Sequence, residues 1–134
     1  MIRVTLKKIG VDSISGDTVD SALAGAVLTV YKDDHHTTVA SGKNSGGTIV
    51  PLSGLTSNSS GIIFDGSLEP GTYYIHETHA PDGYNLMVDD IRLTVSISDG
   101  IETYIPSSNT EETIIPVGGV YSINIKNYCG YELP

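Results

Sequence analysis

The chain has 134 residues with 16 acidic against 7 basic side chains, which gives a formal net charge of -9. A chain of this length can bury one sizeable core, so we expect a single domain. The acidity would repel a phosphate backbone and argues against a nucleic acid or an anionic membrane as partner. Cys129 is the single cysteine, so an intramolecular disulfide is excluded, and no apolar run approaches the ~20 residues of a membrane-spanning helix.

Apolar and polar residues alternate in several short segments, as they do in β-strands with one buried face. The clearest such segments, and the shorter β-prone pieces between them, are 2–9, 26–31, 37–40, 48–52, 62–64, 73–77, 91–97, 101–105 and 121–127. Many short strands separated by turn residues, with almost no helical periodicity, predict an all-β sandwich.

Turn and loop signals separate these strands. Asp99-Gly100 predicts a two-residue hairpin between 91–97 and 101–105. Pro81-Asp82-Gly83 predicts a turn after 73–77, because Pro fixes φ and Gly accepts positive φ. The polar stretches 41–47 and 106–113 predict surface loops rather than a second domain.

Three of the apolar strand faces end in a polar residue, and continuing each alternation places Lys8, Glu77 and Asn127 on the inward side. Burial of a lysine favours its neutral amine, whereas burial of a glutamate favours its protonated form. If the three meet, the amine could attack the carboxamide carbon of Asn127 while the acid carries protons, and ammonia would leave. Alternation also often ends in solvent at strand ends, so the pattern alone leaves a surface location open.

Five segments spread over nearly the whole chain carry a family signature. They are 4–9 (VTLKKI), 22–26 (ALAGA), Gly61 with Phe64, 68–73 (LEPGTY) and 74–84 (YIHETHAPDGY). The most specific part is Glu77 followed, after two residues, by Ala-Pro-Asp-Gly-Tyr at 80–84. These segments resemble the Cna B-type domain, also called SpaA-like or prealbumin-like, of Gram-positive pilins and adhesins. The resemblance implies an immunoglobulin-like or prealbumin-like β-sandwich of about seven or more strands over residues 1–128, followed by a tail at 129–134.

In that family a lysine of the first strand, the glutamate before this turn and an asparagine or aspartate of the last strand form a spontaneous isopeptide bond. By position, the resemblance implies a bond between Lys8 and Asn127, with Glu77 as the proton shuttle. Lys7 and Asn124 are the alternatives, but each falls on the opposite face of its strand from the apolar residues.

Two further positions bear on the comparison with this family. Family members often carry an aspartate where this chain has Gly10, so we expect the turn that leaves the first strand to differ. The family's polymerising Tyr-Pro-Lys motif is not matched, because Tyr31-Lys32 lacks the proline. An anchoring or accessory subunit is therefore favoured over a shaft-forming one.

The chain ends in Leu133-Pro134, which resembles the opening of the Leu-Pro-x-Thr-Gly sorting signal of sortase substrates. A chance Leu-Pro in a tail is the alternative. Together with Met1 directly before a strand and no secretory signal, this ending leads us to expect an excised part of a longer protein. The resemblance implies a location outside a Gram-positive cell, anchored to the wall or part of a pilus. The partners expected there are neighbouring domains, sortase, and peptidoglycan or pilus subunits.

Other candidates for chemistry are weaker. The run 33–36 (DDHH) could bind a divalent metal, but consecutive residues point in different directions, so we expect a solvated loop, no metal and no cofactor. We expect His76 and His79 at the surface and Cys129 as an inert exposed thiol. No catalytic motif indicates an enzyme acting on an external substrate.

The sequence is compatible with two kinds of function, one structural and one in ligand binding. The first is a structural module stiffened by the internal bond. The second is an adhesin module that binds a host glycan or matrix protein, for which eight tyrosines and the segments 33–36 and 41–47 offer surface.

Overall fold

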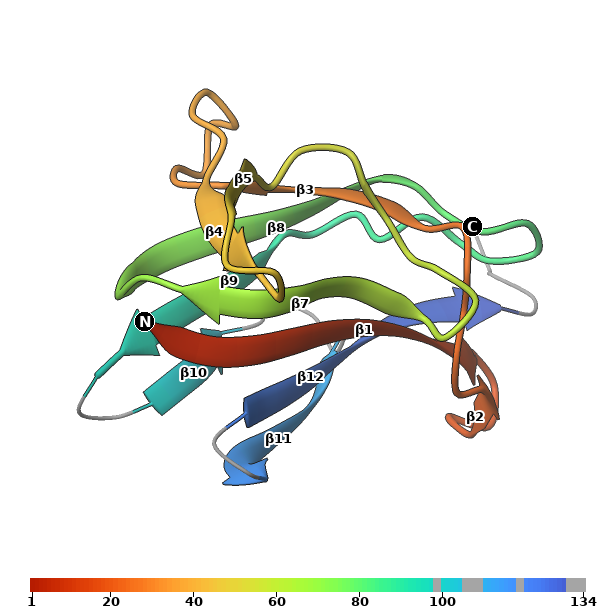
Figure 1. Ribbon diagram of the computed structural model, residues 1–134. Helices are drawn as coiled ribbons and strands as arrows, with labels where there is room; N and C mark the ends of the chain where they lie inside the picture. The colour runs from red at the N-terminus through yellow and green to blue at the C-terminus, as the bar shows by residue number, and fades with distance from the viewer. Residues whose placement is uncertain (98–99, 105–109, 118–119, 130–134) are drawn as a thin grey trace.

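The computed structural model describes residues 1–97, 100–104, 110–117 and 120–129, which form two stacked β-sheets (Figure 1). The strands are β1 (Ile2–Asp12), β2 (Thr18–Asp20), β3 (Val27–Tyr31), β4 (Ser41–Asn44), β5 (Ile49–Pro51), β6 (Leu55–Thr56), β7 (Ile62–Leu68), β8 (Gly71–His79), β9 (Ile91–Ser96), β10 (Gly100–Tyr104), β11 (Thr110–Val117) and β12 (Val120–Cys129). These described ranges include no helix, and so none that is long and apolar enough to cross a membrane. The predicted all-β sandwich is confirmed.

The seven-stranded sheet has the order β11-β12-β1-β7-β4-β5, with β2 paired to β1, and the five-stranded sheet has the order β10-β9-β8-β3-β6. Neighbouring strands are antiparallel except β1 and β12, which run parallel with Leu6 opposite Ile123 and Gly10 opposite Asn127. The first and last strands of the domain therefore lie side by side in the middle of one sheet (Figure 1).

The core fills the space between the sheets with inward-facing residues from both. Val4 and Leu6 of β1 are buried at every second position, as are Ile123 and Ile125 of β12. The facing sheet contributes its own alternating set, Tyr73, Ile75, Ile91, Leu93 and Val95. The alternation predicted along these strands is confirmed, because an apolar face must be covered by the opposite sheet.

Two predicted loops contain strands. The segment 41–47 includes β4, which forms a hairpin with β5, and the segment 106–113 includes the start of β11 at Thr110. Polar composition concealed β4, since its inward position is Gly42, which packs against Phe64 and Leu68 with no side chain of its own. Residues 106–109 of the second predicted loop lie outside the described residues, as does residue 105 at the end of the predicted strand 101–105.

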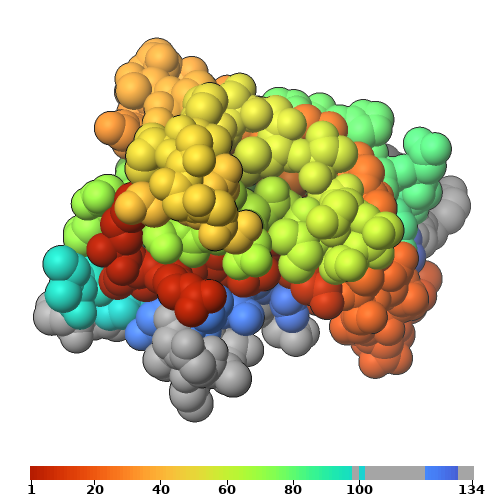
Figure 2. All heavy atoms as spheres, viewed as in Figure 1, coloured from red at the N-terminus to blue at the C-terminus, as the bar shows by residue number. Residues whose placement is uncertain are grey.

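The β-prone piece 37–40 is not a strand. It contains a single bridge, between Val39 and Tyr31, and follows a turn held by the carboxylate of Asp33. That carboxylate accepts hydrogen bonds from the backbone N–H groups of Thr37 and Thr38, so local polar bonds replace strand pairing. Figure 2 shows this part of the chain projecting from one corner of the molecule.

The predicted hairpin after β9 is present as antiparallel pairing, with Gly100 opposite Ser96 and Ile101 opposite Val95. Gly100 has φ +76°, a left-handed conformation that glycine adopts without strain. Asp99, the other predicted turn residue, lies outside the described residues.

Candidate functional site

Lys8, Glu77 and Asn127 meet between the two sheets. Lys8 on β1 and Asn127 on β12 come from neighbouring strands of one sheet, and Glu77 on β8 reaches them from the other. Their exposed fractions are 0%, 1% and 1%. Lys8 Nζ lies 2.9 Å from Glu77 Oε2, and Asn127 Nδ2 donates a hydrogen bond of 2.8 Å to Glu77 Oε1. The surface alternative for these strand ends is therefore wrong, because the opposite sheet extends far enough to cover them.

Each oxygen of Glu77 faces a different group. Oε1 accepts hydrogen bonds from the Met87 N–H and from Asn127 Nδ2, both at 2.8 Å. Oε2 is at ion-pair distance from Lys8 Nζ, although the angles there are not those of a regular hydrogen bond. One carboxyl group thus touches both the amine and the carboxamide nitrogen.

The Asn127 carboxamide is held through its nitrogen. Nδ2 donates a second hydrogen bond, of 2.9 Å, to the carbonyl oxygen of Asn85, while Oδ1 is buried without a hydrogen-bond partner among the described residues. Two acceptors on one nitrogen fix the plane of the amide. An unpartnered buried carbonyl oxygen is costly in a folded core.

Burial lowers the pKa of Lys8 from its ordinary value of 10.5, even though the neighbouring Glu77 acts in the opposite direction. Desolvation disfavours the charged ammonium more than a single carboxylate restores it. The site therefore promotes the neutral amine, which is the nucleophilic form of lysine.

The turn at 80–84 leads into the segment whose backbone groups bind Asn127 and Glu77. Gly83 adopts φ +85° and the Tyr84 N–H donates to the Pro81 carbonyl, so the chain reverses just beyond β8. It then crosses the ends of β1 and β12, where the Asn85 N–H donates to the Tyr128 carbonyl. This crossing positions the Asn85 carbonyl and the Met87 N–H. Sequence reasoning missed both, because backbone groups carry no residue-type signal.

Gly10 accommodates the ring of Tyr84. A side-chain carbon built on Gly10 would overlap the Tyr84 hydroxyl and ring, so only glycine fits there. Burial raises the pKa of the Tyr84 hydroxyl. Strand β1 continues past Gly10 to Asp12, and the turn that leaves the strand follows Asp12.

The competing and secondary candidates lie elsewhere. Lys7 and Asn124 are only half-buried, and each lies on the face of its strand that points away from the core. Cys129 is half-buried at the end of β12 rather than exposed in a tail, because it pairs with Tyr84 through an isolated bridge. Leu133 and Pro134 lie outside the described residues.

The histidines divide into two groups. His35 and His79 are exposed. His36 and His76 are half-buried and both contact Asp90, an arrangement that the sequence spacing did not indicate.

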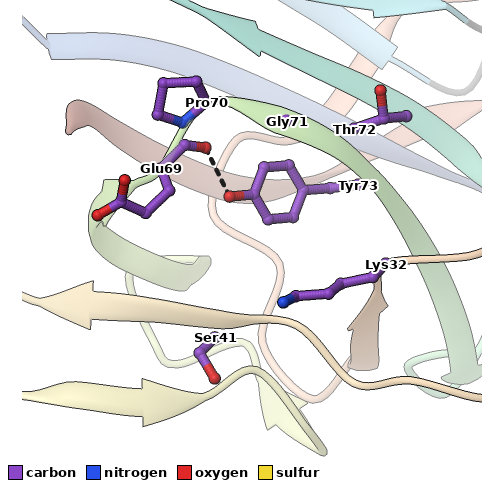
Figure 3. A pocket seen from close by; sticks show the side chains of 7 residues that line it. All are labelled: Lys32, Ser41, Glu69, Pro70, Gly71, Thr72 and Tyr73. Atoms are coloured by element: carbon purple, nitrogen blue, oxygen red, sulfur yellow. Dashed lines mark hydrogen bonds between the residues drawn. The ribbon is translucent and has the colours of Figure 1, made fainter.

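A separate pocket of about 460 Å³ opens beside the start of β8 (Figure 3). Its lining residues are Lys32, Ser41, Glu69, Pro70, Gly71, Thr72 and Tyr73. The Tyr73 hydroxyl donates a 2.6 Å hydrogen bond to the Glu69 carbonyl, so its donor is already used inside the protein. This pocket touches none of the three buried polar residues.

The family model described as a SpaA prealbumin-like fold domain matches residues 4–111. The chain belongs to this family. The matched range includes Lys8 and Glu77 and ends before Asn127. No curated protein sequence gives a significant match.

Solved structures of pilins have the same fold. The minor pilin GBS52 of Streptococcus agalactiae is 22% identical with a TM-score of 0.59, over 98% of this chain and 47% of that one. The group B streptococcus pilus 2b backbone protein is 21% identical with a TM-score of 0.55, over 96% and 41%. A variant of BcpA, the major pilin subunit of Bacillus cereus, is 26% identical with a TM-score of 0.51, over 94% and 28%. The chain therefore spans less than half the length of each of these proteins.

Proposed function

We propose that this chain is a structural module of a Gram-positive pilin or surface protein, stiffened by an isopeptide bond that Lys8 and Asn127 form without a helper enzyme. The observation that carries the proposal is the double contact of Glu77. One carboxyl group reaches the attacking amine through Oε2 and the leaving nitrogen through Oε1. Membership of the SpaA family and the pilin neighbours support the same function.

The reaction begins with a proton transfer from Lys8 Nζ to Glu77, which leaves a neutral amine beside a neutral acid. Desolvation favours the neutral amine, as the lowered pKa of Lys8 indicates. Nζ then attacks Asn127 Cγ, and the carbonyl electrons move onto Oδ1, for which the described part of the chain offers no hydrogen-bond partner in the ground state.

Collapse of this intermediate breaks the bond between Cγ and Nδ2. Glu77 Oε1 and the Asn85 carbonyl already contact Nδ2, so they orient the leaving group, and Glu77 supplies its proton. The amine loses its second proton to Glu77, which completes the relay. The products are an amide between Lys8 and Asn127 and one ammonia. Glu77 is left holding the second proton of the original Lys8 ammonium, and it returns to the carboxylate when it passes that proton to the departing ammonia.

Intact-mass measurement of the purified protein tests this proposal. We expect a deficit of one ammonia from the mass of the sequence, and a peptide containing Lys8 joined to one containing Asn127 after digestion. Glu77→Gln should restore the full mass while the chain still folds, because an amide cannot relay protons. Glu69→Gln is the matched control, since Glu69 is exposed and should leave the deficit unchanged. A full mass for the parent protein would refute the bond.

The proposed setting is extracellular, on a pilus or a cell wall. Its partners there would be neighbouring domains, pilus subunits and sortase, which would recognise a sorting signal that begins at Leu133-Pro134. The chemistry is a single self-catalysed turnover rather than catalysis on an outside substrate.

A second candidate function is binding of a host glycan or matrix protein. The pocket beside β8 supports it. Lys32 lines this pocket together with residues 69–72, among which Gly71 has no side chain to fill the space (Figure 3). Arrays of glycans and matrix proteins, probed with the parent and with Lys32→Ala, test it. Binding that Lys32→Ala abolishes would support an adhesin, and uniform silence would reject it.

A further inference from the structure

A second polar cluster lies on the outer face of the five-stranded sheet. His76 on β8 points outward, since its neighbour Glu77 points into the core. Asp90 immediately precedes β9, which pairs with β8, and His36 comes from the projecting segment between β3 and β4. The three residues are thus far apart in sequence and are brought together by the fold.

Asp90 bridges the two imidazoles. His36 Nε2 lies 2.5 Å from Oδ2, and His76 Nδ1 lies 2.9 Å from Oδ1. One ring nitrogen from each histidine and one carboxylate oxygen all lie within 4.8 Å of one another. The rings are tilted with centroids 4.2 Å apart, so their nitrogens converge on the same carboxylate.

His36 is held in place by its own turn. Its φ of 59° lies in the left-handed region, which is unfavourable for a residue with a side chain. Asp33 stabilises this turn through Thr37 and Thr38, and its hydrogen bond from the Thr37 hydroxyl is the main cause that keeps the pKa of Asp33 low. The ring of Tyr31 packs 4.7 Å from the imidazole. The turn therefore directs His36 toward the sheet instead of into solvent.

We propose that His36, His76 and Asp90 bind a divalent ion of the zinc type, which ties the projecting segment to β8 and β9. Two imidazole nitrogens and one carboxylate oxygen form a zinc donor set that leaves the fourth tetrahedral position open for water. Because ligand bonds to zinc are about 2.0–2.2 Å long, the three ligand atoms, which lie within 4.8 Å of one another, would move closer together around a shared ion. Calcium and magnesium fit less well, since they prefer oxygen ligands throughout.

Titration of the tag-free, metal-stripped protein with ZnCl₂, followed by calorimetry, tests the proposal. We expect binding of one ion per chain, and a higher melting temperature in the presence of excess zinc because the ion binds the folded state. Cobalt(II) should give the visible absorption spectrum of a four-coordinate complex with nitrogen and oxygen ligands.

Single substitutions locate the ion. His36→Gln, His76→Gln and Asp90→Asn should each weaken zinc affinity roughly tenfold or more, since each removes a ligand. His35→Gln and His79→Gln are matched controls on exposed histidines and should bind zinc as the parent does. Absence of stoichiometric zinc binding by the folded parent would overturn the proposal, as would equal loss in the controls. Circular dichroism of each variant shows that the fold is kept.

Discussion

Glu77 and His76 are adjacent on β8, yet they belong to two very different polar clusters. The Glu77 side chain is enclosed between the sheets with Lys8 and Asn127, whereas the His76 side chain is 31% exposed and meets Asp90 on the outer face. In the enclosed cluster, desolvation changes the chemistry of the lysine itself. In the open cluster, the side chains of His36, His76 and Asp90 remain partly exposed to water, so the contacts between them can break and re-form. One step along a strand thus separates a site suited to a covalent bond from one suited to an exchangeable ligand.

The largest expected effect comes from Lys8→Ala, which removes the proposed bond. By analogy with disulfide closure of a loop of ~100 residues, the parent should be more stable by about 4–5 kcal/mol. That corresponds to a fall of roughly 10–20 °C in melting temperature. Differential scanning calorimetry measures it, with Lys7→Ala as the control on the half-buried neighbour. Equal melting temperatures of Lys8→Ala and the parent would show that the bond does not contribute to stability.

The same variant should behave differently under force. Tension that enters at the start of β1 would cross the amide from Lys8 to Asn127 and leave at the end of β12, because these strands are parallel. Most of the sandwich would then carry no load. In single-molecule pulling from the two termini, Lys8→Ala should extend by most of its length, and the parent should not. Similar extension of both proteins would contradict this load path.

Gly10→Ala should lower the free energy of unfolding by about 1–3 kcal/mol, as overpacking of a core does. The new methyl group would overlap Tyr84, which lies across β1 at this point. Urea unfolding of the single and double variants in a cycle with Tyr84→Ala measures the coupling. If the clash is the cause, Gly10→Ala should cost little once Tyr84 is alanine. A full cost in that background would place the cause elsewhere.

The pH dependence of an uncrosslinked form should reveal the perturbed amine. In Asn127→Ala the bond cannot form, and Lys8 titrates with a pKa below 10.5 when folded. The unfolded chain then binds more protons between the folded and unfolded pKa values, so stability rises with pH in that window, by at most about 1.4 kcal/mol per pH unit. Urea unfolding compared with Asn127→Ala/Lys8→Met measures the difference. A flat difference across this window would show that Lys8 is not perturbed.

The smallest effect is expected at the open cluster. His76→Gln in metal-free buffer should change the free energy of unfolding by about 1 kcal/mol or less, because half-exposed ion pairs are screened by solvent. Glu77→Gln, one residue away, should cost as much as Lys8→Ala through loss of the bond. Urea unfolding with a chelator present compares the two variants. Equal losses would erase the distinction between the clusters.

Much of the buried site could be read from the chain itself. Alternation along β8, β12 and the first half of β1 indicated which side of each strand faces the core, and so favoured Lys8 over Lys7 and Asn127 over Asn124. The motif at 80–84 identified Glu77 and the turn that follows its strand. These features are local, and a two-residue period needs no knowledge of the partner strand.

Only the tertiary structure decided how these strands meet. The parallel pairing of β1 with β12, the reach of the facing sheet over both strand ends, and the backbone groups of Asn85 and Met87 all depend on long-range packing. The convergence of His36, His76 and Asp90 has the same origin, since it depends on the pairing of β8 with β9 and on the turn that directs His36 back over the sheet. Strand β4 was concealed because its buried position is a glycine, which leaves no hydrophobic pattern to read. Alternation determines which face of a strand is inward, but burial on that face requires another sheet to cover it.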